Sequence, residues 1–295
     1  MADKTGIEWT DATWNPVTGC TEASPGCDHC YAKTFAERWR GTEGHYFENG
    51  FDVQLRPDKL DQPLRWKKPR KIFVNSMSDL FHDSIPDEFI AEVFAVMRGA
   101  SQHTFQVLTK RHSRMRSLLS SPTFQMETAR GFATPRWPLP NVWLGVSAEN
   151  QQWADIRIPA LLDTPAAVRF VSAEPLLGPI DLQQAMNRDP RDPGGIDWVI
   201  VGGESGHGAR PMDPNWVRMI RNDCKGTIAF LFKQWGEFAP ECQLGISAGD
   251  GKFFRCACRG SQPSHIVAMR RVGKKSAGRS LDGRTWDQYP EVVSA

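Results

Sequence analysis

Three cysteines near the start of the chain are the residues best suited to chemistry. Cys20, Cys27 and Cys30 are spaced C-x6-C-x2-C in residues 15–31, a loop that also carries glycine and proline. Three thiolates can ligate three irons of a [4Fe–4S] cluster, for which cysteine is the usual protein ligand. The fourth iron then stays open to a substrate or cofactor, whereas a structural metal normally has four protein ligands.

Two other interpretations of the cysteines stay open. The triad is also compatible with a zinc knuckle completed by His29 or by a distant residue, and with three unrelated thiols. The chain has 7 cysteines, an odd number, which favours reduced thiols over a disulfide framework. A further metal site at Cys256 and Cys258 is a weaker hypothesis because only one residue separates them, and the state of Cys242 is likewise open.

Length, charge and hydropathy limit the classes of protein to which this chain can belong. The chain has 295 residues, enough for one α/β barrel, and a net charge of only +2, so that any nucleic-acid-binding surface must be local. It has neither an apolar leader at its start nor a run of about 20 apolar residues that would span a bilayer. We therefore expect a cytoplasmic protein that does not enter the membrane.

Apolar, β-prone runs alternate with helix-sized segments along most of the chain. This alternation is typical of buried parallel strands in βα units. The expected strands, which follow one just before Cys20, are residues 72–74, 104–108, 141–146, 168–171, 198–201 and 228–232, and the expected helices are 31–40, 87–99, 112–120, 152–162 and 214–223.

These units predict a partial or complete (β/α) barrel, with an open doubly wound sheet as the alternative. The barrel would comprise residues 1–236, and residues 237–295 would form a C-terminal extension packed on it. Two stretches, 122–140 and 189–195, interrupt the alternation and have the proline and glycine content of surface loops. The first is long enough for a lid.

Polar side chains follow almost every expected strand. Because ligands bind at the carboxyl ends of parallel strands, these side chains should converge on one mouth. The residues are Asp79, Lys110, Glu149, Glu174, Glu204 and Lys233.

Basic residues gather in two stretches, Arg65–Lys71 and Arg270–Arg284. They are candidates for phosphate contacts with nucleic acid, the alternative being solvated loops. Eleven tryptophans are many for this length, and an exposed subset would be able to stack on bases.

The cysteine triad and the strands that follow resemble the radical-SAM superfamily. More closely, the whole chain resembles a family of bacterial and phage proteins of unassigned function. The matching stretches are residues 7–31, 75–81, 108–111, 143–150, 171–175, 201–206, 233–237 and 273–286.

The superfamily resemblance implies a partial barrel and a [4Fe–4S] cluster whose fourth iron binds S-adenosylmethionine (SAM), which is cleaved to a radical. Here Cys20, Cys27 and Cys30 take the ligand positions, although the usual first gap is three residues rather than six. Ser78 or Asp79 would bind the methionine amino group, where the superfamily often has a Gly-Gly-Glu stretch. Glu149 and Glu174 would hold further polar groups of cofactor or substrate, and Lys110 and Lys233 would face phosphate or carboxylate.

Three functions follow as hypotheses. The first is a radical-SAM-like enzyme acting on nucleic acid in DNA repair or modification, similar in general plan to the spore photoproduct lyases and served by an electron donor. The second is an iron–sulfur protein that binds nucleic acid without SAM turnover. The third is a radical enzyme for a small molecule or peptide, favoured by the near-neutral charge. The sequence leaves the substrate and the oligomeric state open.

Overall fold

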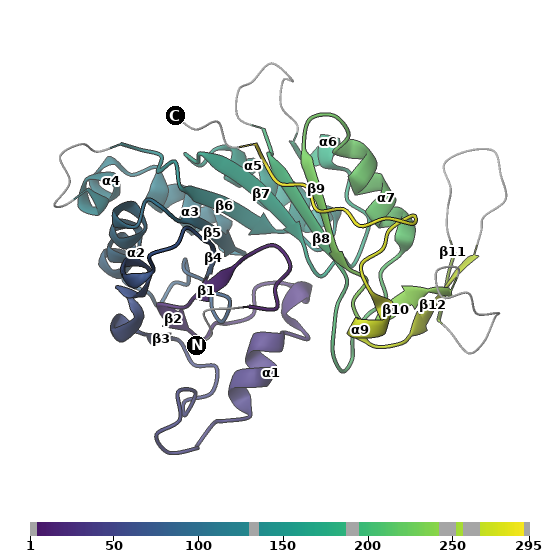
Figure 1. Cartoon of the computed structure of the whole chain (residues 1–295), viewed down its shortest axis with the longest axis horizontal. Helices are drawn as coiled ribbons and strands as arrows, with labels where there is room; N and C mark the ends of the chain where they lie inside the picture. The colour runs from purple at the N-terminus through teal and green to yellow at the C-terminus, as the bar shows by residue number, and fades with distance from the viewer. Residues whose placement is uncertain (1–4, 130–135, 187–194, 242–251, 256–265, 292–295) are drawn as a thin grey trace.

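The computed structural model describes residues 5–129, 136–186, 195–241, 252–255 and 266–291. Figure 1 shows a curled parallel sheet with helices along its outer side, and a smaller β-structure beside it. Within the described residues, no helix combines the length and the apolar character needed to cross a bilayer.

Seven parallel strands form the sheet and lie side by side in their order along the chain. They are β1 (Ala12–Trp14), β4 (Lys71–Val74), β5 (Thr104–Thr109), β6 (Val142–Ser147), β7 (Val168–Ala173), β8 (Trp198–Gly202) and β9 (Ala229–Gln234). A doubly wound sheet reverses its strand order at a switch point. Since the order here never reverses, the doubly wound alternative is wrong, and the fold is a half barrel of the partial (β/α) type.

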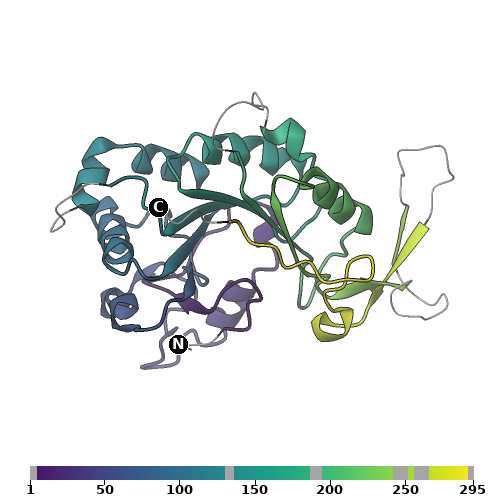
Figure 2. The same cartoon turned by 45° about the horizontal axis from the view of Figure 1, so that its top comes forward.

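Helices cover the convex face of the sheet (Figure 2). They are α2 (Asp87–Gly99), α3 (His112–Leu119), α4 (Pro122–Thr128), α5 (Gln151–Leu162), α6 (Leu182–Met186) and α7 (Pro214–Asp223). Caps fix where two of them begin: the Asn150 side chain accepts from Trp153 N at 3.2 Å, and Asp213 accepts from Asn215 N at 2.8 Å. Helices α5 and α7 therefore start within one residue of the positions that the sequence predicts.

Apolar side chains pack on both faces of the sheet. Outside, the buried stripe of α2 that includes Phe89, Val93 and Met97 packs against the strands. Inside, the Trp9 ring lies 4.7 Å from Phe73 and 6.1 Å from Trp198, ring centre to ring centre. This inner aromatic cluster fills the barrel toward the amino ends of the strands, so that free space remains at the carboxyl ends.

Residues between β1 and β4 form an excursion on the side where the barrel is open. It contains a ribbon of β2 (Val17–Thr18) and β3 (Gln54–Leu55), helix α1 (Tyr31–Glu37) and short 3-10 turns at Pro25–Cys27, Pro57–Lys59 and Gln62–Arg65. Helix α1 buries Ala32 and Ala36, while the aromatic rings of Tyr31, Phe35 and Trp39 are exposed. The predicted helix over residues 31–40 ends three residues earlier than expected.

The stretch 122–140 was expected to be a loop, and this is wrong in its first half. Helix α4 occupies Pro122–Thr128 and buries Phe124 and Thr128. Ser121 caps it by accepting from Phe124 N at 3.4 Å, so that a serine before a proline starts a helix here. Residues 130–135 and most of 189–195 lie outside the described residues, as do Cys242, Cys256 and Cys258.

The C-terminal region adds a second sheet and then returns to the barrel. Strands β10 (Phe238–Pro240), β12 (Ile266–Arg271) and β11 (Lys252–Arg255) form an antiparallel sheet in that order, followed by α9 (Lys274–Ala277). Residues 286–289 then run antiparallel along the free edge of β9, where Gln288 N donates to Phe230 O at 3.2 Å. Tyr289 continues across the open side, and its ring lies 3.6 Å from the Lys71 ammonium at the start of β4.

Candidate functional site

A cavity of 1220 Å³ opens at the carboxyl ends of the strands. That is the end at which parallel barrels bind their ligands. Most of the site residues expected from the sequence line it: Cys20, Cys27, Cys30, Ser78, Asp79, Lys110, Glu174 and Lys233.

The three cysteines are free thiols, partly exposed to this cavity. Cys27 ends the 3-10 turn of the loop, and Cys30 directly precedes α1. Cys20 is fixed through its backbone, whose N–H donates to Phe51 O at 3.2 Å. Burial, followed by the nearby Asp79 carboxylate, raises the pKa of the Cys20 thiol to about 12. A metal that binds Cys20 must therefore displace a proton.

Among the described residues, no three His, Cys, Asp or Glu side chains are grouped so as to hold a single metal ion. His29 lines the cavity and packs against Gly208, where an added Cβ would lie 2.9 Å from its ring. The zinc alternative thus finds no ready ligand set in this part of the chain. A cubane cluster carries each thiolate on a different iron, so that its ligands need not converge on one point. The donor set of three open thiols around one cavity fits such a cluster.

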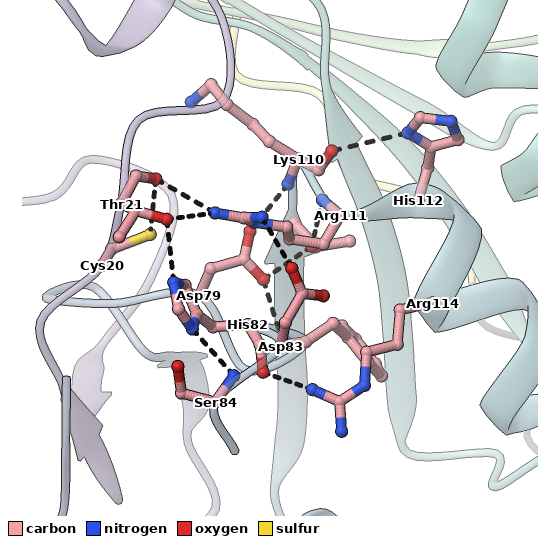
Figure 3. A network of polar contacts seen from close by, with 12 residues as sticks. Cys20, Thr21, Asp79, His82, Asp83, Ser84, Lys110, Arg111, His112 and Arg114 are labelled. Carbon is pink, nitrogen blue, oxygen red and sulfur yellow. Dashed lines mark hydrogen bonds and ion pairs between the residues drawn. The ribbon is translucent and has the colours of Figure 1, made fainter.

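The loop is anchored next to Cys20 by a network that Figure 3 shows. Arg111 Nη2 donates to Thr21 Oγ1 at 2.6 Å and to Thr21 O at 3.3 Å. Because His82 Nδ1 accepts from Ser84 N at 3.1 Å, its Nε2 carries the proton and donates to Thr21 Oγ1 at 2.9 Å. Burial and the nearby Arg111 lower the pKa of His82, which favours this neutral form. Residues of the β4 and β5 ends thus hold one end of the loop.

A buried ion pair anchors the middle of the loop. Glu149 Oε1 accepts from Gly26 N at 3.2 Å, and its Oε2 lies 3.0 Å from Arg157 Nη1. Both side chains are 0% exposed, and Arg157 also donates to Ser147 O at 2.8 Å. Glu149 therefore lies behind the loop, where its carboxylate positions the residue before Cys27. The sequence-based expectation had placed it among the groups that hold cofactor or substrate.

Arg210 anchors the loop from the side of β8. Its guanidinium forms two bonds to Glu204, from Nε to Oε2 at 2.9 Å and from Nη2 to Oε1 at 2.7 Å. The same group reaches the loop, with 2.8 Å from Nη1 to Asp28 Oδ2 and 2.8 Å from Nη2 to Pro25 O. Such charge-assisted bonds are stronger than neutral ones. Arg210 thus ties the strand end to both sides of Cys27.

We expect Arg210→Ala to loosen the cysteine loop without unfolding the barrel. The change removes bonds worth about 1–3 kcal/mol to the loop after allowance for their partial exposure. A cluster reconstituted on this variant should lose iron to a chelator about tenfold faster, equivalent to about 1.4 kcal/mol. Arg116→Ala, which removes an exposed ion pair to Asp163 at 3.5 Å, is the matched control. Equal chelation rates for Arg210→Ala and wild type would contradict the anchoring role.

Ser78 and Asp79 lie at the cavity with most of their bonding capacity used by the protein. Ser78 Oγ donates to Val17 O at 2.9 Å. Asp79 accepts from Thr109 Oγ1 at 2.6 Å and from Lys110 N at 2.9 Å. Both side chains therefore have a structural role in holding neighbouring backbone and side-chain groups, which the sequence does not reveal.

Glu174, Lys233 and Lys110 differ in their partners. Lys233 Nζ lies 3.1 Å from Glu174 Oε1, and Ser172 Oγ donates to Glu174 Oε2 at 3.2 Å. Within the described residues, no carboxylate lies within ion-pair distance of the Lys110 ammonium, and its side chain extends away from the Arg111 network (Figure 3). Lys110 is thus the better placed of the two lysines to meet an anion.

Family comparison assigns the chain over nearly its whole length. Residues 4–290 match the family described as "Protein of unknown function (DUF5131)". The chain belongs to this DUF5131 family. We found no matching curated protein. Among solved structures, a spore photoproduct lyase complexed with dinucleoside spore photoproduct is similar, with 11% identity and a TM-score of 0.42 over 86% of this chain and 67% of that one. This is a weak likeness.

The two basic stretches occupy different ends of the barrel. Arg65–Lys71 precedes β4 and therefore lies at the amino ends of the strands, away from the cavity. In the stretch Arg270–Arg284, Lys274 lines the cavity and Arg271 donates to Gly206 O at 3.0 Å. Of the two stretches, the second contributes a residue, Lys274, to the lining of the cavity.

Sequence reasoning missed the three arginines that hold the loop. Arg111 lies 90 residues from Thr21, and Arg210 lies 185 residues from Pro25. Arg157 sits inside a predicted helix, in which a charged residue on an otherwise apolar face was the available signal. Glu204 precedes Arg210 by six residues at a strand end, but no local pattern announces that the pair reaches back to the loop.

Proposed function

We propose that this DUF5131 protein binds a [4Fe–4S] cluster through Cys20, Cys27 and Cys30 and is a radical-SAM-like enzyme that acts on nucleic acid. One observation carries the proposal: three open thiols line a large cavity at the ligand-binding end of a half barrel. With SAM bound at its free iron, such a cluster would supply the electron that cleaves SAM. The radical formed from SAM would then abstract a hydrogen atom from the substrate.

The residues of the chain have distinct roles in this proposal. The loop brings the three thiols to the cavity. Arg111 at Thr21, Glu149 at Gly26 and Arg210 at Pro25 hold it there. Ser78, Asp79 and Glu174 line the cavity, and we assign them to contacts with SAM. The inner aromatic cluster fills the barrel below the cavity, toward the amino ends of the strands.

Nucleic acid is proposed as the substrate class because of cations around the cavity. Lys110, which lacks an ion-pair partner among the described residues, and Lys274 both line it, and Arg271 lies near its rim. Cations so placed can contact the phosphates of a strand whose base enters the cavity. A small-molecule or peptide substrate would need a phosphate or carboxylate to use the same groups.

The deciding experiment uses anaerobically purified, reconstituted protein. Iron and sulfide content are measured, and the electron paramagnetic resonance (EPR) spectrum of the reduced cluster is recorded before and after SAM is added. We expect about four irons per chain and a spectrum that changes with SAM, followed by release of 5′-deoxyadenosine.

Two outcomes would redirect the proposal. About four irons with an unchanged spectrum would leave an iron–sulfur protein that binds nucleic acid without SAM turnover. SAM cleavage together with no binding of any labelled oligonucleotide would select the radical enzyme for a small molecule or peptide. Absence of a cluster under all reconstitution conditions would overturn the proposal.

A further inference from the structure

Three exposed aromatic side chains stand together on α1 and the turn that follows it. Tyr31, Phe35 and Trp39 are 61%, 46% and 37% exposed, and no other Phe, Trp or Tyr side chain that the structure describes is as exposed as these. Their spacing of i, i+4 and i+8 places them along one side of the helix, as a feature that we call the aromatic ridge. Figure 1 shows α1 on the open side of the barrel, apart from the helices of the convex face.

The aromatic ridge is continuous with the cavity. Tyr31 lines the cavity directly after Cys30, the third candidate ligand. Its hydroxyl donates to Ser76 O, just past the end of β4, at 2.6 Å, and Ser76 lines the cavity as well. This bond ties the first residue of α1 to the wall of the barrel. A ligand that lies along the ridge therefore reaches the cavity and its thiols without leaving the protein surface.

Neighbouring rings hold the other two members of the ridge in place. The Phe35 ring meets Phe47 edge-on, with 5.6 Å between the ring centres and 89° between the planes. The Trp39 ring stacks on His45 at 4.2 Å and 19°. Both rings keep open surface despite these contacts. Because binding to rings that are already held costs little side-chain entropy, the ridge is a preformed surface for stacking.

Charged side chains beside the ridge are neutralised in pairs. Lys33 lies 2.7 Å from Glu22. Arg40 lies 2.6 Å from Glu37 and 2.8 Å from Asp52. These acids therefore do not present free charge that would repel a phosphate backbone, and the cations are not free to attract one. A ligand on the ridge has to gain its binding energy from the rings.

We infer that the aromatic ridge stacks on the bases of a single-stranded nucleic acid and leads that strand into the cavity. Aromatic side chains stack on unpaired bases of any sequence, whereas a duplex covers the faces of its bases in its own stack. Residues four apart in a helix lie about 6 Å apart along the axis, whereas successive bases of a duplex lie about 3.4 Å apart. The inference rests on the proposed function, since it names the form of nucleic acid that the cavity takes.

The test measures how a labelled single-stranded oligonucleotide and the duplex of the same sequence bind to the reconstituted protein, by fluorescence anisotropy. Wild type is compared with Phe35→Leu, which removes a ring of the ridge and keeps an apolar side chain. Met219→Leu is the matched control, because Met219 is a 41% exposed apolar residue on α7, on the convex face. The EPR response of wild type to SAM, recorded on the same preparation, tests the proposed function separately.

We expect wild type and Met219→Leu to bind the single strand more tightly than the duplex, and Phe35→Leu to bind the single strand about tenfold more weakly than wild type. The salt dependence of binding should be the same in Phe35→Leu and wild type, because the change removes no phosphate contact. Should Phe35→Leu fold poorly, Trp39→Leu removes another ring of the ridge and should show the same loss.

Two results overturn the inference. The first is equal binding of the single strand by Phe35→Leu and wild type, which leaves the ridge to a protein partner. The second is a preference of wild type for the duplex. In either case an EPR spectrum of wild type that changes with SAM leaves the proposed function standing.

Discussion

Changing Glu149 to alanine should destabilise the folded chain by about 3–5 kcal/mol. The substitution leaves Arg157, 0% exposed, as an uncompensated buried charge and removes the acceptor for Gly26 N. Chemical denaturation of the cluster-free protein measures this loss. We also expect the cluster to load poorly because the segment before Cys27 is released.

A double variant separates stability from loop positioning. Glu149→Ala with Arg157→Met removes both charges, and replacing a buried pair by apolar groups is often nearly neutral. We expect most of the stability to return while cluster loading stays low, since Gly26 N still lacks its acceptor. Full recovery of loading in the double variant would show that Glu149 contributes only to stability.

Replacing Cys30 with alanine should abolish the visible absorbance of the reconstituted cluster and all SAM cleavage. Of the cysteines that the structure describes, two then remain at the cavity, too few to hold a cubane whose three ligated irons leave one open. The fold should survive, because Cys30 lies in a partly exposed loop. Iron analysis and product chromatography measure the effect.

Cys224→Ala is the matched control for this substitution. Cys224 is buried in the outer core and is not among the residues that line the cavity, so that it is a packing residue rather than a ligand. The control should retain iron, absorbance and SAM cleavage. Persistence of any of these in Cys30→Ala would remove that residue from the ligand set.

The half barrel was predictable because its strands are buried on both faces. Every residue of β6 is buried, and such continuous apolar runs mark parallel strands in a single sequence. Helix α4 was missed because proline at its start was taken as a loop signal, although proline is tolerated in the first turn. The sequence of a single strand does not predict whether the barrel closes, because closure depends on how many strands pair.

The sequence predicts that charged residues gather at the cavity, but it does not predict what each of them contacts there. Lys110, Glu174 and Lys233 follow strands, and strand ends meet at one place. Glu149 follows a strand as well, yet it turns away from the cavity toward Arg157, an orientation fixed by a partner inside the next helix. Arg111 and Arg210 contact loop residues 90 and 185 positions away, a separation over which periodicity carries no information.

The pairing of residues 286–289 with β9 also bears on how the protein is made. During synthesis β9 leaves the ribosome more than fifty residues before its partner segment. Until that segment appears, the backbone N–H and C=O groups on the outer edge of β9 lack their hydrogen-bond partners. Exposed strand edges are where nascent chains join one another. Trp198 shares this delay, because its Nε1 donates to Gln288 O, 90 residues later, at 2.9 Å. The edge of β9 can therefore be covered only after residues 286–289 have been synthesised.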